Sequence, residues 1–180
     1  MQNTETQILE VTEKMIREGG YNSFSFRDIA AAVGIKSSSV HYHYPTKATL
    51  SAAVAAYYTN KTMDHLGPPD LLIQKGEDPI DIYIKLFRKA LTTDKRMCMF
   101  GMLGSEVKDL PNEVVVQIKI FFERNIEWLT EAYTLKDSIG DAKTKAISTI
   151  ALVEGALIVS NALDDIKAFD QAAVLIRENI

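Results

Sequence analysis

The sequence predicts an all-α fold, with a small three-helix head at the N-terminus followed by a larger helical body. Apolar residues recur every three to four positions through most of the 180 residues. No run shows the apolar and polar alternation that a half-buried strand requires. Gly67-Pro68-Pro69 is the clearest break in the helical pattern. We therefore expect a head over residues 1–66 and a body over residues 67–180, with residues 67–79 as the connection.

The first two helices of the head have clear end signals. An amphipathic helix ends at Gly19-Gly20-Tyr21, and Ser25 is then a favourable N-cap, because its hydroxyl can accept from an otherwise unpaired backbone N–H. Asp28 lies three positions further on, where a carboxylate completes a capping box. Gly34 falls where the second helix must stop, because glycine tolerates the left-handed conformation of such a turn.

Another helix follows the glycine turn. One of the serines at 37–39 can cap it, and Val40 and Tyr44, four positions apart, are expected to share its buried face. Pro45 ends this helix, and Thr46 caps the next one. Two short helices joined by a glycine turn over residues 25–44 are typical of a helix-turn-helix, which places its second helix in the major groove of DNA.

The charge distribution restricts where DNA could bind. The whole chain has 20 basic and 24 acidic residues, so a general nucleic-acid coat is not expected. Between Ile29 and Met63, however, there is no Asp or Glu, which suits local contacts with phosphate. A helical hairpin with a polar surface explains the two-helix pattern equally well, so both explanations stay open on the pattern alone.

Residues 4–63 resemble the DNA-binding domain of the TetR family of transcriptional regulators. The matching elements are Ser-Phe-Arg-Asp-Ile-Ala at 25–30, Val-Gly-Ile at 33–35 and Val-His-Tyr-His-Tyr-Pro-Thr-Lys at 40–47. Tyr44 stands where Phe is usual in the family, and His41 stands where Tyr is common. The resemblance implies DNA contacts by the recognition helix, its supporting helix and the lysine after it: Ser25, Arg27, Lys36, Ser37, Ser38, Ser39, His41, Tyr42, His43 and Lys47.

Helical periodicity continues through the body. Pro79 opens one helix, a shorter helix is expected around 97–107, and Pro111 opens a long one. Gly140-Asp141 starts a further helix that runs to about Leu163, and a last helix covers about 168–179.

The last two long helices, at about 141–163 and 168–179, are predicted to pair with a second copy of the chain. Residues 146–163 are apolar nearly all round, and in a body this small the simplest extra cover is a second subunit. The family resemblance also implies a homodimer, whose two-fold axis would match a palindromic operator in double-stranded DNA. The alternative is that this helix is the central core of a monomer.

Composition indicates a cytoplasmic protein without a membrane partner. Glu154, Ser160 and Asn161 interrupt the most apolar run, and no segment has the pattern of a signal peptide. A single cysteine excludes a disulfide framework within the chain and suits a reducing compartment.

An effector pocket is expected in the body, which is rich in aromatic and methionine side chains. For any single one of these residues, a place in an ordinary core is the simpler explanation. Polar residues within apolar helical stretches are candidates for orienting a ligand. The candidate pocket residues are Phe87, Cys98, Met102, Glu106, Phe121, Phe122, Trp128 and Glu154.

Cys98 has two explanations. Residues 96–111 resemble a segment of a TetR subgroup in which some members sense electrophiles or oxidants through this thiol. Lys95 and Arg96 could favour the thiolate, which is the reactive form. The alternative is that a lone cysteine in an apolar stretch is a small buried hydrophobic residue.

The sequence lacks the usual signatures of an enzyme. His41 and His43 are two apart on a helix, so they point in different directions and make a poor metal pair. There is no phosphate loop, dinucleotide fingerprint or nucleophile elbow. We expect no catalysis, metal or cofactor. The prediction is a DNA-binding transcriptional regulator, a repressor released by an apolar or electrophilic small molecule; the alternative is a protein-interaction module or an enzyme with no DNA role.

Overall fold

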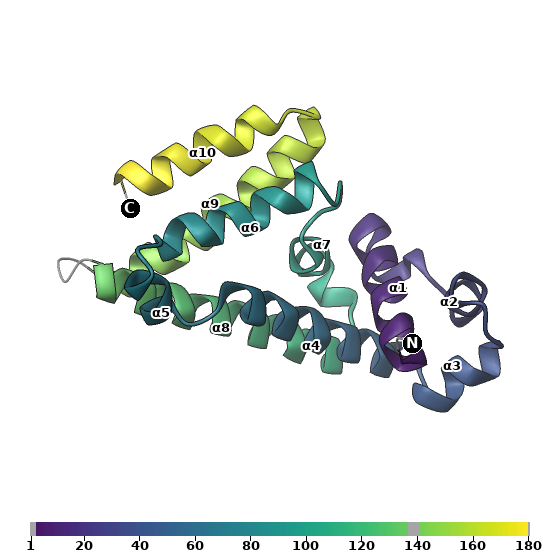
Figure 1. Cartoon of the computed structure of the whole chain (residues 1–180). Coiled ribbons are helices and arrows are strands. Elements are labelled where there is room, and N and C mark those ends of the chain that lie inside the picture. The colour runs from purple at the N-terminus through teal and green to yellow at the C-terminus, as the bar shows by residue number, and fades with distance from the viewer. Residues whose placement is uncertain (1–2, 137–140, 180) are drawn as a thin grey trace. The chain divides into compact units, whose positions relative to one another are not determined.

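The computed structural model describes residues 3–136 and 141–179 and confirms the all-α fold (Figure 1). Within these ranges the chain forms helices joined by turns and contains no strand. The helices divide into two compact units. Unit 1 comprises residues up to Lys61 together with Met99–Phe121, and unit 2 comprises Thr62–Cys98 together with the residues from Phe122 onward. The division into domains at residue 66 stays a prediction.

Unit 1 holds the predicted head up to Lys61 and part of the predicted body. Its core includes Ile8 and Ile16 of the first helix, which are fully buried, and a stack of Phe100 on Phe121 with ring centroids 4.0 Å apart. Tyr58 lies edge-on to Phe100 at 5.8 Å. The helices of unit 1 are α1 (Thr4–Gly19), α2 (Phe26–Val33), α3 (Ser37–His43), α7 (Met99–Ser105) and the first parts of α4 (Lys47–Leu66) and α8 (Asn112–Lys136), with 3-10 turns η1 (Tyr21–Ser23) and η2 (Val107–Asp109).

Most helix ends in unit 1 follow the predicted chemistry. The first helix ends at Gly20, whose φ of 77° is accessible to glycine at little strain. Thr46 caps α4, because its Oγ1 accepts from the backbone N–H of Thr49 at 3.0 Å. The predicted serine cap of α3 is wrong. Lys36 occupies the N-cap position and no side chain caps this helix, so the serines are left for its surface.

Unit 2 contains the remaining parts of α4 and α8 together with α5 (Pro69–Gln74), α6 (Pro79–Thr92), α9 (Ala142–Leu163) and α10 (Ile166–Asn179). The predicted connection at 67–79 therefore includes a short helix. Pro69 suits its first turn, and Leu72 is buried beneath it. The helix expected around 97–107 is shorter, because residues before Met99 are not helical.

The last two helices differ slightly from their predicted bounds. Asp141 caps α9, accepting from the backbone N–H groups of Lys143 and Thr144, whereas Gly140 lies outside the described residues. Helix α10 begins at Ile166, two residues earlier than expected, since the Asp165 side chain accepts from the N–H of Lys167 at 2.9 Å and so caps the earlier start.

Helices α9 and α10 lie antiparallel and are joined by a tight turn at Asp164 (Figure 1). By length and composition alone α9 could span a membrane, but such a helix is also found in the core of soluble proteins. Only 39% of its most apolar window is buried within the chain. The rest of this apolar window is not buried by the chain itself and is available for contact with another molecule.

Candidate nucleic-acid interface and effector region

The turn between α2 and α3 is built from local hydrogen bonds. Ser25 and Asp28 form the predicted capping box: the backbone N–H of Asp28 donates to the Ser25 hydroxyl at 3.3 Å, and that of Ser25 donates to Asp28 at 2.9 Å. Hydrogen bonds from Ser25 lower the pKa of Asp28 from its usual value. Gly34 closes α2 in the left-handed conformation, with φ 79° and ψ 32°. These interactions fix the angle at which α3 leaves the turn.

Helix α3 has one buried side and one exposed polar side. Val40 is fully buried and Tyr44 is 8% exposed, which confirms that they share the inner face. Ser38, His41 and Tyr42 follow helical spacing on the outer face, and Tyr42 is 85% exposed. An aromatic side chain so exposed has no role in the core of unit 1, so it is available for a partner.

His41 is held by a ring contact that the sequence did not suggest. Its imidazole packs edge-on against Phe26 of α2, with ring centroids 4.5 Å apart. An edge-to-face pair of this kind restricts the ring without covering it, and His41 stays exposed. The departure from the Tyr common in the family therefore places a positioned imidazole at this point of the α3 surface.

Tyr44 makes a contact that the usual Phe could not. Its hydroxyl donates to Oε1 of Glu5 in α1 at 3.2 Å. Burial and the neighbouring Glu5 carboxylate raise the pKa of Tyr44 to about 12, so the hydroxyl is a donor at neutral pH. The end of α3 is thereby attached to the first turn of α1.

Lys47 is partly engaged within the head. Its ammonium donates to the backbone carbonyl of Phe24 at 2.8 Å and lies 4.9 Å from the ring centroid of Tyr21 and 4.4 Å from that of Phe24. Burial lowers the pKa of Lys47 from its usual value. An ammonium has three donors, so one hydrogen bond to Phe24 leaves capacity for a phosphate.

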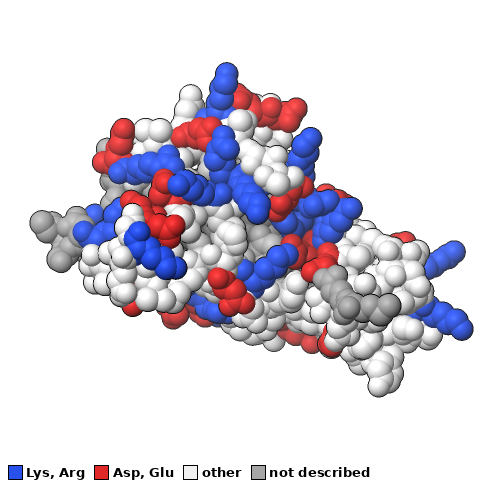
Figure 2. Space-filling model, viewed as in Figure 1, with Lys and Arg blue, Asp and Glu red and all other residues white. Residues whose placement is uncertain are grey.

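The other predicted DNA contacts lie on or beside this surface. Ser25, Arg27, Lys36 and Ser38 are exposed, while Ser37, Ser39 and His43 are partly exposed. Ser25 also serves as the cap of α2, so its hydroxyl already donates to Asp28 at 2.6 Å. On the face shown in Figure 2 the region around α2 and α3 is mostly uncharged.

A charged cluster around the buried Glu13 joins α1 to α4. Glu13, which is 5% exposed, accepts from Arg17 at 3.3 Å and from Lys61 at 3.0 Å. The Arg17 guanidinium also lies 5.7 Å from the ring centroid of Tyr58. With both cations on one carboxylate, the pairing fixes how α1 lies against α4 within unit 1.

Glu106 lies against the end of α1. Its Oε2 accepts from the backbone N–H of Tyr21 at 3.1 Å, across 85 positions of sequence. A Cβ placed on Gly20 would come within 2.2 Å of Glu106 Oε1, so the carboxyl is seated where only glycine fits. The residue that the sequence assigned to an effector pocket thus contacts the corner between α1 and η1, and nothing in the local sequence signals this contact.

The eight predicted effector residues lie in both units. Met102, Glu106 and Phe121 belong to unit 1, and Phe87, Cys98, Phe122, Trp128 and Glu154 belong to unit 2. In unit 2, Tyr83 brings two of them together: its ring centroid is 4.7 Å from that of Phe87 and 5.9 Å from that of Trp128. Tyr83 is one of the aromatic residues in which the body is rich, and it lies one helical turn before Phe87.

Trp128 also borders an open groove of about 540 Å³ in unit 2. Its indole N–H donates to the backbone carbonyl of Gly67 at 2.6 Å. The groove is lined by Met63, Asp64, Gly67, Pro68, Pro69, Arg124, Glu127, Trp128 and Glu131. Of the predicted effector residues, only Trp128 is among those lining it.

Cys98 and Glu154 come together in the interior of unit 2. The Cys98 thiol is fully buried and hydrogen-bonds to the Glu154 carboxyl. Burial raises the pKa of Glu154 to about 7, and the Cys98 hydrogen bond opposes that increase. The Oε2 atom of Glu154 is buried and has no hydrogen-bond partner within the described chain. A buried acceptor without a donor is uncommon in native proteins.

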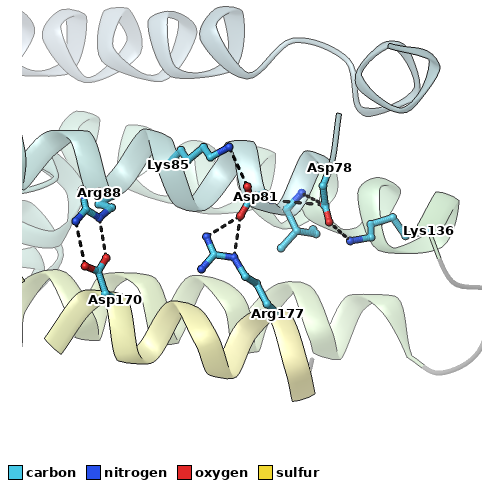
Figure 3. A network of polar contacts seen from close by, with 8 residues as sticks. Asp78, Asp81, Lys85, Arg88, Lys136, Asp170 and Arg177 are labelled. Carbon is cyan, nitrogen blue, oxygen red and sulfur yellow. Dashed lines mark hydrogen bonds and ion pairs between the residues drawn. The ribbon is translucent and has the colours of Figure 1, made fainter. Parts of the chain in front are cut away.

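Ion pairs attach α10 to α6 (Figure 3). Arg88 donates to both carboxylate oxygens of Asp170, at 2.7 and 3.0 Å, and hydrogen bonds from Arg88 lower the pKa of Asp170. Arg177 pairs with Asp81 at 2.6 Å. Figure 2 shows the same mixture of basic and acidic groups over this region. The pairs fix α10 on α6 while the opposite side of α10 stays uncovered.

Comparisons with known proteins agree with the helix-turn-helix at the N-terminus and with the helical fold of the chain. The family model described as bacterial regulatory proteins, tetR family, matches residues 8–54. A TetR transcriptional regulator from Legionella pneumophila has a solved structure with a TM-score of 0.85 and 33% sequence identity, over 100% of this chain and 98% of that one. The structure of AibR in complex with isovaleryl coenzyme A and operator DNA has a TM-score of 0.61 and 20% identity, over 84% of each chain.

A curated relative gives a more local match. The uncharacterized HTH-type transcriptional regulator YuxN of Bacillus subtilis (strain 168) is 32% identical over 93 residues, which is 51% of this chain. The match spans 29% of that relative's own length. This similarity therefore supports a helix-turn-helix regulator. It does not indicate that the two proteins bind the same ligand.

Proposed function

The chain belongs to the TetR family of DNA-binding transcriptional regulators, and on that premise we propose that it is a repressor that leaves its operator when a small molecule binds its body. Members of this family are regulators and not enzymes. They bind operator DNA and act as dimers. The observation that carries the proposal is the outer face of α3, where Ser38, His41 and Tyr42 form an exposed polar surface behind a fixed glycine turn.

The proposed contacts divide into two kinds. Ser37, Ser38 and Ser39 begin the recognition helix and would meet base edges, whereas Tyr42, His43 and Lys47 would position the protein on phosphates. Arg27, on the outer side of α2, would reach the backbone next to that helix. Three serines predict little about the operator sequence, because a hydroxyl can bond to several base edges.

A homodimer through α9 and α10 would place two recognition helices on a palindromic operator. Both helices expose large apolar side chains on one side: Ile147, Ile158, Val159 and Leu163 of α9, and Val174 and Leu175 of α10. Ala151 and Gly155 lie between them on α9 and would allow close approach. Covering an exposed apolar surface of this kind is what stabilises obligate interfaces.

Release by a non-covalent effector is better supported than release by a thiol-reactive compound. Cys98 is fully buried and its thiol faces the Glu154 carboxyl. A thiolate is the reactive form, and both burial and an acidic neighbour disfavour that charge. AibR, whose fold is similar, was solved with both isovaleryl coenzyme A and operator DNA. An effector that binds more tightly to the conformation in which the two heads are wrongly spaced for the operator would release the DNA.

Selection of bound duplexes from a random pool tests the function. We expect an enriched palindrome, with affinity that falls steeply as salt rises, because bound phosphates release counterions. Tyr42→Ala should weaken binding by about 5- to 30-fold, the equivalent of roughly 1–2 kcal/mol, without changing stability. No enrichment, or binding that ignores salt, would favour a protein-interaction role instead.

The dimer is tested separately. Ile158→Glu puts a charge at the centre of the exposed α9 surface and should convert the dimer to monomer in light scattering at micromolar concentration. Lys119→Glu, at an exposed position of α8 and so outside both helices of the proposed interface, serves as the control. A monomeric wild type would refute the proposed interface.

A further inference from the structure

The body contains a carboxyl group, that of Glu154, in which one oxygen is buried without a hydrogen-bond donor. Glu154 is the only charged residue between Lys145 and Asp164, within the most apolar run of the chain. Its Oε2 atom is buried without a hydrogen-bond donor, and the only described group that bonds to its carboxyl is the Cys98 thiol. Leaving a buried polar atom unpaired destabilises a fold, because the atom loses its hydrogen bonds to water and gains none in return. Among the few buried side-chain atoms of the described residues that lack a partner, Glu154 Oε2 is the one that belongs to a carboxyl group.

The surroundings of Glu154 restrict what could supply the missing donor. Helical spacing places Ile150 one turn before it and Ile158 one turn after it, so the carboxyl lies in an apolar row. Ile150 is buried and Ile158 is 53% exposed, which puts Glu154 at the border between the inner face of α9 and its exposed apolar face. A ligand for this place needs a polar head and an apolar remainder.

We propose that Glu154, with Cys98 beside it, is the polar anchor of the effector site and binds the protonated amine of a compact apolar molecule. This inference rests on the proposed ligand-responsive function and names the chemical class of the effector. An ammonium supplies N–H donors to Oε2 and a positive charge to the carboxylate. The Cys98 thiol keeps its own hydrogen bond to the same carboxyl, so both oxygens are then satisfied.

Electrostatics agree with a cationic ligand. Burial raises the pKa of Glu154 to about 7, and among the described residues no charged side chain contributes to that shift. The carboxyl can therefore change between neutral and ionised forms near neutral pH, and an ammonium beside it favours the ionised form. Amine binding should then release a proton and weaken as the pH falls below 7.

The test is calorimetric titration of the full-length protein without DNA, using n-hexylamine and, as the uncharged match, n-hexanol. We expect the amine to bind at least tenfold more tightly than the alcohol at pH 7.5. Its affinity should fall about eightfold between pH 7.5 and pH 6, from the linkage of binding to one carboxyl with a pKa near 7. The affinity of the alcohol should not change over that range.

Two variants complete the test. Glu154→Gln keeps the shape and an acceptor but cannot ionise, so the preference for the amine and its pH dependence should vanish. Glu77→Gln, an exposed glutamate between α5 and α6, is the matched control and should behave as wild type. Equal binding of amine and alcohol, undiminished amine binding by Glu154→Gln, or no amine binding up to millimolar concentration overturns the proposal.

If Glu154→Gln does not fold, the pH dependence of amine binding by the wild-type protein still tests the proposal. Operator binding is measured in a separate experiment, so a failure there would refute the regulatory function and leave the amine titration readable. Normal operator binding with no amine binding would refute only the anchor.

Discussion

Removing the Glu106 carboxyl should loosen the head of this regulator. The perturbation is Glu106→Ala, which deletes the acceptor for the backbone N–H of Tyr21 at 3.1 Å. A hydrogen bond to a charged group contributes about 1.5–3 kcal/mol when buried. Because Glu106 is partly exposed, we expect about 1–2 kcal/mol. For a chain of this size that corresponds to a Tm lower by roughly 2–8 °C.

The affinity of Glu106→Ala for operator DNA should fall together with its Tm. The Gly20-Tyr21 corner precedes α2, so a freed corner allows head orientations that do not fit DNA. If about 1 kcal/mol of the lost stability favours head orientations that do not fit DNA, each head binds roughly fivefold more weakly. Glu106→Gln keeps an acceptor without the charge and should show about half the loss in Tm. Glu123→Ala, an exposed glutamate of α8, is the control and should stay within about 0.5 kcal/mol of wild type.

A double-mutant cycle gives the sharpest refutation. Gly20→Ala alone should be strongly destabilising, because the new Cβ would lie 2.2 Å from Glu106 Oε1 and φ is 77°. Combined with Glu106→Ala, the clash is gone and only the backbone strain of about 1–3 kcal/mol is left. Thermal unfolding by circular dichroism measures all four proteins. Additive losses, or a Glu106→Ala protein with unchanged Tm and operator affinity, would show that the contact does not hold the corner.

Two further predictions concern the head. Asp28 has a lowered pKa in the fold, so its contribution to stability is present above its unfolded pKa near 4 and disappears as the pH falls through the folded value. Denaturant titrations should show this acid-dependent loss in wild type and a smaller one in Asp28→Asn; parallel pH curves would contradict it. Lys47→Met keeps the stem over Tyr21 and Phe24 but removes the donor to the Phe24 carbonyl, which should lower the free energy of unfolding by about 1 kcal/mol. If Lys47 also meets phosphate, the slope of log affinity against log salt should decrease by about one, and an unchanged slope would assign it a structural role alone.

What the sequence predicted well depends on short-range chemistry. The Ser25–Asp28 capping box and the Gly34 turn involve neighbours in the chain, so their residue types are sufficient to predict them. The buried pair Val40 and Tyr44 follows from helical periodicity in the same way. The serine cap of α3 failed because the residue before the first serine already occupied the cap position.

Long-range contacts were beyond prediction from one sequence. Tyr44 reaches Glu5 across 39 positions and Glu106 reaches Tyr21 across 85, and neither pair shows a local pattern. The effector residues were chosen for being aromatic or for being polar in apolar surroundings, and such residues also build ordinary cores. Only the structure separates Glu106, which contacts a backbone corner, from Glu154, whose carboxyl is buried beside a thiol.

The helices α4 and α8 each run without a break from one compact unit into the other, changing unit after Lys61 and after Phe121. At these two crossings the chain passes between the units along hydrogen-bonded helical backbone, which resists the local unfolding that a protease needs. The third crossing, from Cys98 to Met99, leads from a non-helical stretch into α7. Unit 1 is also assembled from two separate stretches of sequence. A fragment cut at residue 66 would lack Phe100 and Phe121, and with them the aromatic stack that packs on Tyr58. We therefore expect that the proposed DNA-binding head cannot be excised at residue 66 and stay folded, and that a fusion protein borrowing it must carry α7 and the start of α8 as well.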